Sequence, residues 1–379
     1  MSRPAVPLLA FGLASAFPFD SRAEVQLEAA APATIAFEGL LQADFNWFDS
    51  DVVQLNGDDD DREFQLRRAE FVFKGKAGHF DWVLGYDAKA GRFLDTSLRL
   101  KLGPSYLVAG QFKQPIGLEE LSSTRQNDFI AKALPTNLFG VGRRLGLGHG
   151  QDARRWGYSL GVFGRELANG PGRGGGFAAR GYVAPVVTDA SILHIGLAVM
   201  DVDTDADSLR LQARPGGDLA AARLLDTGAL RDVDRQRTYG TEVLWLRGPV
   251  KIQMEAMQTQ IDRYGAVEDH DASSGYFSAL WNVGGATWRY KGGLPTMPLP
   301  QEGGGLLQLG LRIDHADLDD GELRGGRATH WTLGANWYWR TNFKLSANYV
   351  KVESRRHAAD GVLIQDDPSI IELRAQYHW

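Results

Sequence analysis

The sequence has no cysteine among its 379 residues. Free thiols are readily oxidised outside the cytoplasm, so a chain without cysteine is compatible with export. No run of 18 or more apolar residues occurs, which excludes a hydrophobic helix that crosses a membrane. Positive charge is also in short supply. The formal net charge is −6 at pH 7, which argues against a nucleic-acid-binding protein.

Sequence motifs of catalysis and of tight metal binding are missing as well. The eight histidines are scattered without an H-E-x-x-H pair, and no G-x-S-x-G motif occurs. The acidic segment 201–207 begins like a calcium loop, but Ala206 and Gln212 stand where such a loop needs glycine and glutamate. We therefore predict no enzymatic activity, no cofactor and no metal-binding residues. Loose retention of divalent ions by the segment 201–207 is the alternative.

Glycine and tryptophan, by contrast, are abundant, with 45 and 10 residues. Glycine suits turns and tightly packed strands, and tryptophan suits the interface between lipid and water. From about residue 34 to the end, apolar and polar residues alternate with a period of two. This is the period of a strand whose two faces meet different surroundings. In one example, Phe343, Leu345, Ala347 and Tyr349 share one face.

Sixteen segments show this alternation. They are residues 34–48, 62–74, 78–89, 95–102, 106–113, 142–149, 154–165, 176–184, 191–201, 237–247, 250–262, 274–283, 305–315, 328–339, 342–353 and 369–379. The connections between them are alternately short and long, which is typical of outer-membrane barrels. One connection, residues 288–304, is long where a short turn is expected. The pattern predicts an all-β fold: a 16-stranded antiparallel transmembrane β-barrel over residues 34–379, located in the bacterial outer membrane.

The first residues resemble a secretory signal peptide. Arg3 precedes the apolar run 5–17, and Ser21 and Ala23 place small residues at the −3 and −1 positions of a cleavage site. We predict a signal peptide over residues 1–23 and a short periplasmic linker over residues 24–33.

The final strand carries a second signal. Ile371, Leu373, Ala375, Tyr377 and Trp379 lie on one face of it. An apolar edge strand is an aggregation hazard unless it is paired, and a barrel pairs it with the first strand. The machinery that assembles barrels selects a terminal strand of this kind, so we predict Tyr377 and Trp379 as the assembly signal. A soluble all-β protein, such as a tandem sandwich or a propeller, is the alternative, because alternation alone does not exclude it.

Two stretches resemble a known family. They are the sequence GQFKQPIGLEELSSTRQNDFI at residues 110–130 and the sequence QLRRAEF at residues 65–71, followed by Lys74-Gly75-Lys76. Both are similar to the phosphate-selective porin O and P family. The resemblance implies a trimeric 16-stranded barrel that is surrounded by outer-membrane lipid and lipopolysaccharide. It also implies a third extracellular loop, here residues 114–141, that folds into the pore, and passage of small anions past basic side chains.

Two sets of residues are candidates for the pore. The candidates for anion binding are Arg67, Arg68, Arg99, Lys101, Lys113 and Arg125. Guanidinium groups suit phosphate because they bind oxyanions through two parallel hydrogen bonds. The candidates for the constriction loop are Gln114, Pro115, Gly117, Glu119, Glu120 and Asp128. Proline and glycine give such a loop a fixed shape.

The adjacent Arg67 and Arg68 pose a geometric problem. Neighbouring residues of a regular strand face opposite sides, so one arginine would face lipid. An arginine on the lipid face at mid-membrane costs about 2–4 kcal/mol. Phe64 and Leu66 are in the opposite phase to Phe71, which predicts a β-bulge between them. A position of Arg67 near a membrane interface is the alternative.

The charges assigned to the lumen are mixed. Alternation places basic Arg99, Lys101, Lys113, Arg155, Arg165, Lys251, Arg312, Lys344 and Arg374 there, with acidic Asp81, Asp87, Glu242, Glu255, Asp314 and Glu372. The resemblance implies a ladder of basic side chains along the pore, but acidic residues interrupt it here. We therefore expect weak anion selectivity. The expected function is that of a passive porin for small anions, with inorganic phosphate among the candidates. The alternatives are a general or sugar-admitting pore, and an outer-membrane enzyme or adhesin that uses its barrel only as an anchor.

Overall fold

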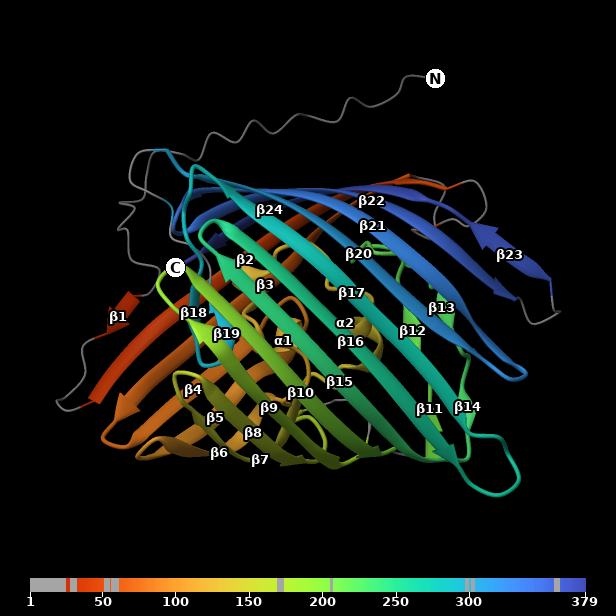
Figure 1. Cartoon of the computed structure of the whole chain (residues 1–379), viewed down its shortest axis with the longest axis horizontal. Helices are drawn as coiled ribbons and strands as arrows, with labels where there is room; N and C mark the ends of the chain where they lie inside the picture. The colour runs from red at the N-terminus through yellow and green to blue at the C-terminus, as the bar shows by residue number, and fades with distance from the viewer. Residues whose placement is uncertain are drawn as a thin grey trace.

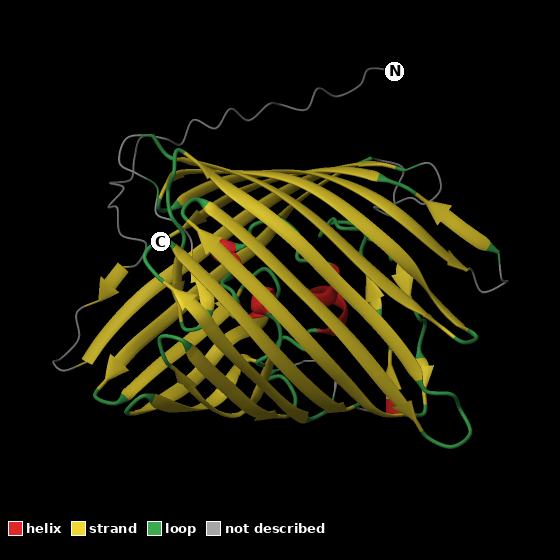
Figure 2. Ribbon diagram, in the orientation of Figure 1, coloured by secondary structure: helices red, strands yellow, loops and turns green. Residues whose placement is uncertain are grey.

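The computed structural model describes residues 25–27, 33–50, 55, 61–168, 174–204, 207–296, 300, 304–357 and 362–379. Sixteen long antiparallel strands close into a barrel (Figures 1 and 2). They are β2 (Ala33–Asp49), β3 (Arg62–Ala77), β4 (Phe80–Asp87), β5 (Arg92–Leu102), β6 (Ser105–Lys113), β7 (Arg143–Asp152), β8 (Trp156–Phe163), β9 (Gly176–Val187), β10 (Ser191–Asp203), β15 (Val233–Arg247), β16 (Val250–Arg263), β17 (His270–Val283), β20 (Leu306–Asp320), β21 (Leu323–Arg340), β22 (Phe343–His357) and β24 (Ser369–His378). All sixteen predicted strands are therefore confirmed.

The barrel closes where the last strand pairs with the first long one. β24 and β2 are antiparallel, with Tyr377 opposite Leu41, and the amide of Gly39 donates to the carbonyl of Trp379 at 3.1 Å. The Trp379 ring lies directly over Gly39, where an added Cβ would stand 2.1 Å from the ring. The same ring also contacts Phe37 and Phe71. The terminal aromatic thus packs across the seam of the barrel.

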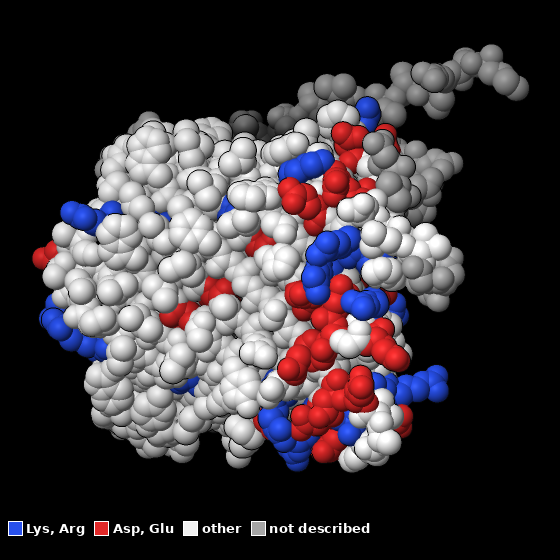
Figure 3. Space-filling model, turned by 45° about the vertical axis from the view of Figure 1, so that its right-hand side comes forward, with Lys and Arg blue, Asp and Glu red and all other residues white. Residues whose placement is uncertain are grey.

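The two faces of the wall differ as alternation predicts. On β24, outward Leu373 is 46% exposed, whereas the inward Glu372 and Arg374 are 0% and 6% exposed. The outer surface shows a broad, mostly uncharged band between two charged rims (Figure 3). An apolar outer band of this kind matches the hydrocarbon layer of a membrane. No helix among the described residues is long and apolar enough to cross a bilayer.

The predicted bulge is present in β3. Gln42 pairs with Arg68 and Ala43 pairs with Leu66, so Arg67 is an extra residue between them. A bulge releases one residue from strict alternation. Both arginines therefore point inward, and no side chain of this pair is forced into lipid.

Shorter elements lie in the connections. The connection from β6 to β7 contains α1 (Leu118–Leu121), a 3-10 turn (Thr124–Gln126) and α2 (Leu134–Phe139). The connection from β10 to β15 forms two small ladders, β11 (Ser208–Leu209) with β14 (Leu230–Arg231) and β12 (Gln212–Ala213) with β13 (Leu225–Asp226). β23 (Leu363–Asp366) pairs antiparallel with residues 354–357 of β22. These connections leave and rejoin the barrel strands at one end of the barrel, called here the loop end.

The opposite end, called the turn end, has short turns with one exception. The connection from β17 to β20 contains the hairpin β18 (Arg289–Lys291) and β19 (Leu294–Thr296). The hydroxyl of Tyr290 lies 2.7 Å from Nδ1 of His194, and Arg180 donates to the carbonyl of Gly293 at 3.2 Å. Because His194 and Arg180 point inward, the irregular connection noted in the sequence folds back into the barrel.

The N-terminal predictions concern residues that are mostly outside the described ranges. The predicted signal peptide, residues 1–23, lies outside them, as does most of the predicted linker, residues 24–33. Within the linker, β1 (Val25–Leu27) pairs with residues 35–37 of β2.

Candidate functional site

The connection 114–142 contacts inward side chains on the far wall of the barrel. Its first helical turn is held by Glu255 of β16, whose carboxylate accepts from the amides of Leu118 and Glu119 at 2.6 and 2.7 Å. Amides at the beginning of a helix have no acceptor within the helix, so an external carboxylate satisfies them. Tyr276 steadies Glu255 by donating to it at 2.5 Å.

Basic and amide side chains of the far wall hold the rest of this connection. They donate to its backbone carbonyls: Arg312 to Ala131, Arg374 to Ile130, Lys344 to Asn127 and Asn336 to Asp128, at 2.6–3.0 Å. Lys251 also pairs with the Asp128 carboxylate at 2.5 Å. These cations of β16, β20, β22 and β24 are therefore engaged in positioning the connection.

Two acidic residues of the connection, Glu119 and Glu120, bond to other residues of the connection. Glu119 accepts from Thr136 Oγ1 at 2.6 Å and from the amide of Ala133 at 3.0 Å. Burial raises the pKa of Glu119 above its ordinary value. Glu120 forms an ion pair with Lys132. Burial acts to raise the pKa of Glu120, but Lys132 and Lys113 outweigh it and lower that pKa to about 2.

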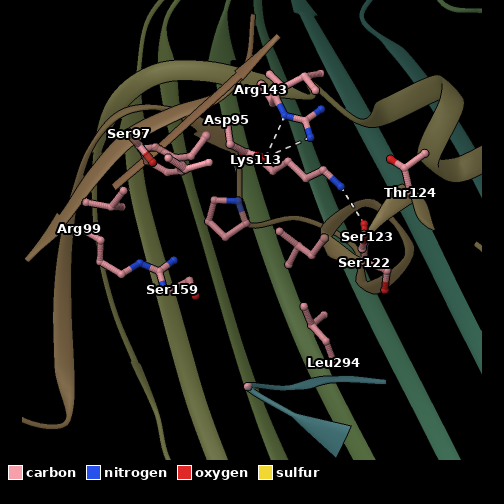
Figure 4. A pocket seen from close by; sticks show the side chains of 18 of the residues that line it. Asp95, Ser97, Arg99, Lys113, Ser122, Ser123, Thr124, Arg143, Ser159 and Leu294 are labelled. Carbon is pink, nitrogen blue, oxygen red and sulfur yellow. Dashed lines mark hydrogen bonds and ion pairs between the residues drawn. The ribbon is translucent and has the colours of Figure 1, made fainter. Parts of the chain in front are cut away.

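A cavity of about 720 Å³ lies between the connection, the wall formed by β2–β9 and the β18–β19 hairpin, on the side toward the turn end. Its basic lining residues are Lys74, Arg99, Lys113, Arg125, Arg143, Arg180 and Lys291. Lys113 donates to the carbonyls of Glu120 and Ser122, and Arg143 pairs with Asp95 (Figure 4). Arg99 lies 4.2 Å from the centre of the Tyr106 ring. We call this cavity the turn-end cavity.

A second cavity, of about 310 Å³, lies toward the loop end. Its basic lining residues are Arg67, Arg68, Arg92, Lys113, Lys132, Arg143 and Arg374, against the acidic Glu120, Glu166 and Asp218. We call it the loop-end cavity. Lys113, Thr124 and Arg143 line both cavities. A series of cations therefore lines both cavities, largely on β3–β7, and Lys113 and Arg143 are common to the two.

Most of the anion-binding candidates lie on this series. Arg67 and Arg68 line the loop-end cavity, Arg99 and Arg125 line the turn-end cavity, and Lys113 lines both. Arg125 pairs with Glu38 at 3.2 Å, and Arg68 pairs with Glu70 at 3.1 Å. Lys101 is placed elsewhere.

Lys101 stands beside a short turn at the turn end, with a side chain that is 44% exposed. It pairs with Asp81 at 2.6 Å. It is absent from the lining of both cavities.

The other predicted residues, of the constriction loop and of the assembly signal, pack within the protein. Gln114 is buried and donates to the carbonyl of Phe112, and Pro115 lines the turn-end cavity. Gly117 has φ +76°, and a Cβ there would stand 2.7 Å from Met257. The positive φ favours glycine, whereas the flexible end of the Met257 side chain could move aside. Tyr377 and Trp379 lie beside each other at the barrel seam.

Sequence reasoning missed several cations of the series, Arg143 and Lys132 among them, and the acidic Asp218. Alternation assigns Arg143 to the outer face with Leu145, but it begins β7 directly after Gly142, which has φ +68°. Periodicity does not constrain a side chain at such a strand end. Lys132 and Asp218 lie in connections, where no period exists. One indication of Lys132 was present in the sequence: it lies two residues after the segment 110–130, which resembles the porin family.

No group of three or more His, Asp or Glu residues suited to a metal ion occurs in the part of the chain that the structure describes. The two cavities present guanidinium, ammonium and hydroxyl groups, with carboxylates that pair with some of the cations. The guanidinium, ammonium and hydroxyl groups bind oxyanions reversibly.

Comparison with known proteins agrees with this geometry. Residues 35–379 match the family described as phosphate-selective porin O and P. Porin O of Pseudomonas aeruginosa is 24% identical over 365 residues, which are 83% of this chain and 82% of Porin O. An uncharacterized protein of Caulobacter vibrioides is 25% identical over 312 residues, which are 75% of this chain, and the match spans 62% of that relative's length.

Solved structures show the same fold. OmpT of Vibrio cholerae has a TM-score of 0.60 at 11% identity, covering 93% of this chain and 99% of OmpT. An anion-selective porin from Comamonas acidovorans has a TM-score of 0.55 at 11% identity, covering 92% of this chain and 100% of that porin. The resemblance seen in residues 65–71 and 110–130 is confirmed. The chain belongs to the phosphate-selective porin O and P family and is a β-barrel protein of the bacterial outer membrane.

Proposed function

We propose that this protein is a passive, non-enzymatic porin that admits small anions, inorganic phosphate among them. The observation that carries the proposal is the series of cations that lines both cavities along the β3–β7 wall. Family membership and the name of the Comamonas porin support the same solute class. Rings or rows of Arg and Lys at a constriction are the usual anion-selective device.

In this proposal the connection 114–142 is the constriction loop. One side of the loop is bonded to four residues of the far wall, Glu255, Arg312, Lys344 and Arg374. A solute would therefore pass on the other side of the loop, next to the cations. An anion would pass from Arg67 and Arg68 to Lys113 and Arg143, and then to Arg125 and Arg99. Conduction requires weak binding at several sites, which a row of partly paired cations provides.

Acidic residues that pair with cations of the series favour a second candidate function. Asp95, Glu38 and Glu70 each pair with one of these cations. Partial neutralisation weakens the positive potential, so a weakly selective general pore is the runner-up. We also propose a homotrimer on the basis of family membership. A monomer in native detergent extracts would contradict that assembly.

Phosphate block of chloride current tests the proposed function. In planar bilayers containing the full chain, added phosphate should reduce chloride current, and Arg68→Ala should weaken this block about tenfold because one charge-assisted contact is lost. Lys101→Ala, which removes a cation outside both cavities, is the matched control. Equal block in all three proteins, or none in the wild type, would contradict the proposal of a phosphate-binding path.

A further inference from the structure

The loop-end cavity contains a carboxylate from a distant part of the chain. Asp218 lies in the connection between β10 and β15, yet its Oδ2 stands 3.2 Å from Nε and from Nη2 of Arg67. The same oxygen lies 3.5 Å from Nη2 of Arg374. Arg68 lines the same cavity and acts electrostatically on this carboxyl. Arg67, Arg68 and Arg374 are called here the arginine cluster.

Asp218 is held in place by the residues around it in the chain. Leu219, Ala220 and Leu224 are buried against Phe48, Val350 and Ile370 of the barrel wall. Before it, Gly217 approaches the wall so closely that an added Cβ would stand 3.0 Å from Asn46 Nδ2. Arg214 closes the segment by donating to the carbonyl of Ala220 at 2.7 Å. The connection thus delivers a carboxylate to a fixed point rather than leaving it on a loose loop.

The arginine cluster differs in how far each member is neutralised. Arg374 makes a bidentate pair with Asp44 at 2.6 Å through both contacts. Arg68 pairs with Glu70, but its buried Nε has no hydrogen-bond partner among the described residues. For Arg67, Asp218 is the carboxylate partner within the described part of the chain. Removal of Asp218 would therefore open Arg67 as a donor for an oxyanion, beside the Nε of Arg68, which has no partner among the described residues.

We propose that Asp218 is a built-in competitor for the arginine cluster, which an incoming oxyanion such as phosphate must displace and which speeds the release of that anion. This inference rests on the proposed function, since it concerns the affinity of the same path. A carboxylate offers the two-oxygen geometry that guanidinium groups also recognise in phosphate. Conduction fails when binding is too strong for the solute to leave. A fixed carboxylate beside the cluster keeps binding weak.

The charge state of Asp218 is consistent with this role. Burial acts to raise the pKa of its carboxyl, but Arg67, Arg374 and Arg68 outweigh burial and hold the pKa below its ordinary value. Asp218 is therefore ionised at neutral pH and competes as an anion.

The test compares Asp218→Asn with Asp226→Asn in the full-length protein in planar bilayers. Asp226 lies in the same connection and pairs with Arg210, whose side chain is 51% exposed, so its substitution removes the same charge outside the cavities. We expect half-maximal phosphate block of chloride current at an about tenfold lower phosphate concentration in Asp218→Asn. We expect no change in Asp226→Asn. Asp218→Ala should behave like Asp218→Asn, and Asp218→Glu, which keeps the charge, should stay near the wild type.

The outcomes separate this inference from the proposed function. Phosphate block that is unchanged or weaker in both Asp218→Asn and Asp218→Ala overturns the competitor, whereas weaker block in Arg68→Ala than in the wild type keeps the proposed function. A wild-type channel without phosphate block overturns both. Equal tightening in Asp226→Asn also overturns the competitor, because it would reflect the net charge of the connection rather than the position of Asp218. Cell-surface yield and heat-modifiable migration on gels identify a variant that fails to fold. If Asp218→Asn fails to fold, the phosphate block measured in Asp218→Ala decides between these outcomes.

Discussion

At the residue scale, the barrel depends on a few positions where the backbone or a side chain has no alternative. The sequence predicted the paired arginines and, from the phase change between Leu66 and Phe71, the bulge at Arg67 that turns both of them inward. It did not predict their partners Glu70 and Asp218. Ion pairs across a lumen depend on strand registers and on loop paths that alternation does not encode.

Gly39 gives a prediction about the closing seam. Gly39→Ala places a Cβ within the ring of Trp379, which is packed between Phe37 and Phe71, so the overpacking should cost about 1–3 kcal/mol. We expect a lower urea midpoint for unfolding in detergent. Gly181→Ala is the control, because nothing lies within 4 Å of its added Cβ. An unchanged midpoint in Gly39→Ala would show that the terminal ring moves aside at little cost.

At the element scale, the connection 114–142 is shaped more by the far wall than by its own sequence. Pro115 and Gly117 indicated a loop of fixed shape, and Gly117 indeed has a positive φ. What the sequence did not reveal is that basic residues assigned to the pore, such as Arg312 and Lys344, bind this connection instead. The alternation along a strand identifies which side chains point inward. It does not tell whether such a side chain contacts solvent or the backbone of a loop.

Glu255 gives a prediction about this connection. Glu255→Ala removes the acceptor of the buried amide of Leu118 and of the partly buried amide of Glu119, and should destabilise the local loop structure by about 1–3 kcal/mol. We expect higher and noisier single-channel conductance with normal barrel assembly. Gln258→Ala on the same strand, whose side chain is exposed on the outer face, is the control. Quiet wild-type conductance in Glu255→Ala would argue against this anchor.

The ion pair of Glu120 and Lys132 gives a prediction about pH. Because the pKa of Glu120 is lowered from 4.5 to about 2, its ionised form stabilises the fold above pH 4.5, and this contribution is lost as the pH falls toward 2. Glu120→Gln should therefore be less stable than the wild type by about 1.5–3 kcal/mol at neutral pH. The difference in unfolding midpoint should persist down to about pH 5 and shrink below pH 4.5. A difference that grows on acidification would refute the pair.

At the scale of the whole molecule, the period of two, the rhythm of connections and the terminal Trp379 were enough to predict the closed 16-stranded barrel and its membrane. The path through the barrel was predictable only in part. The cations Arg67, Arg68, Lys113, Arg99 and Arg125 line two cavities that share the lining residues Lys113, Thr124 and Arg143. The segment that carries Asp218 and the inward hairpin of β18 and β19 were not predictable, because neither has a periodic pattern.

The central claim is that the cationic wall makes the pore prefer anions. The reversal potential of single channels in a KCl gradient measures this preference directly. The wild type should reverse toward the equilibrium potential of chloride, and Arg67→Ala with Arg68→Ala should shift the reversal potential toward zero because two cations of the row are removed. A wild-type reversal potential on the potassium side would contradict the account.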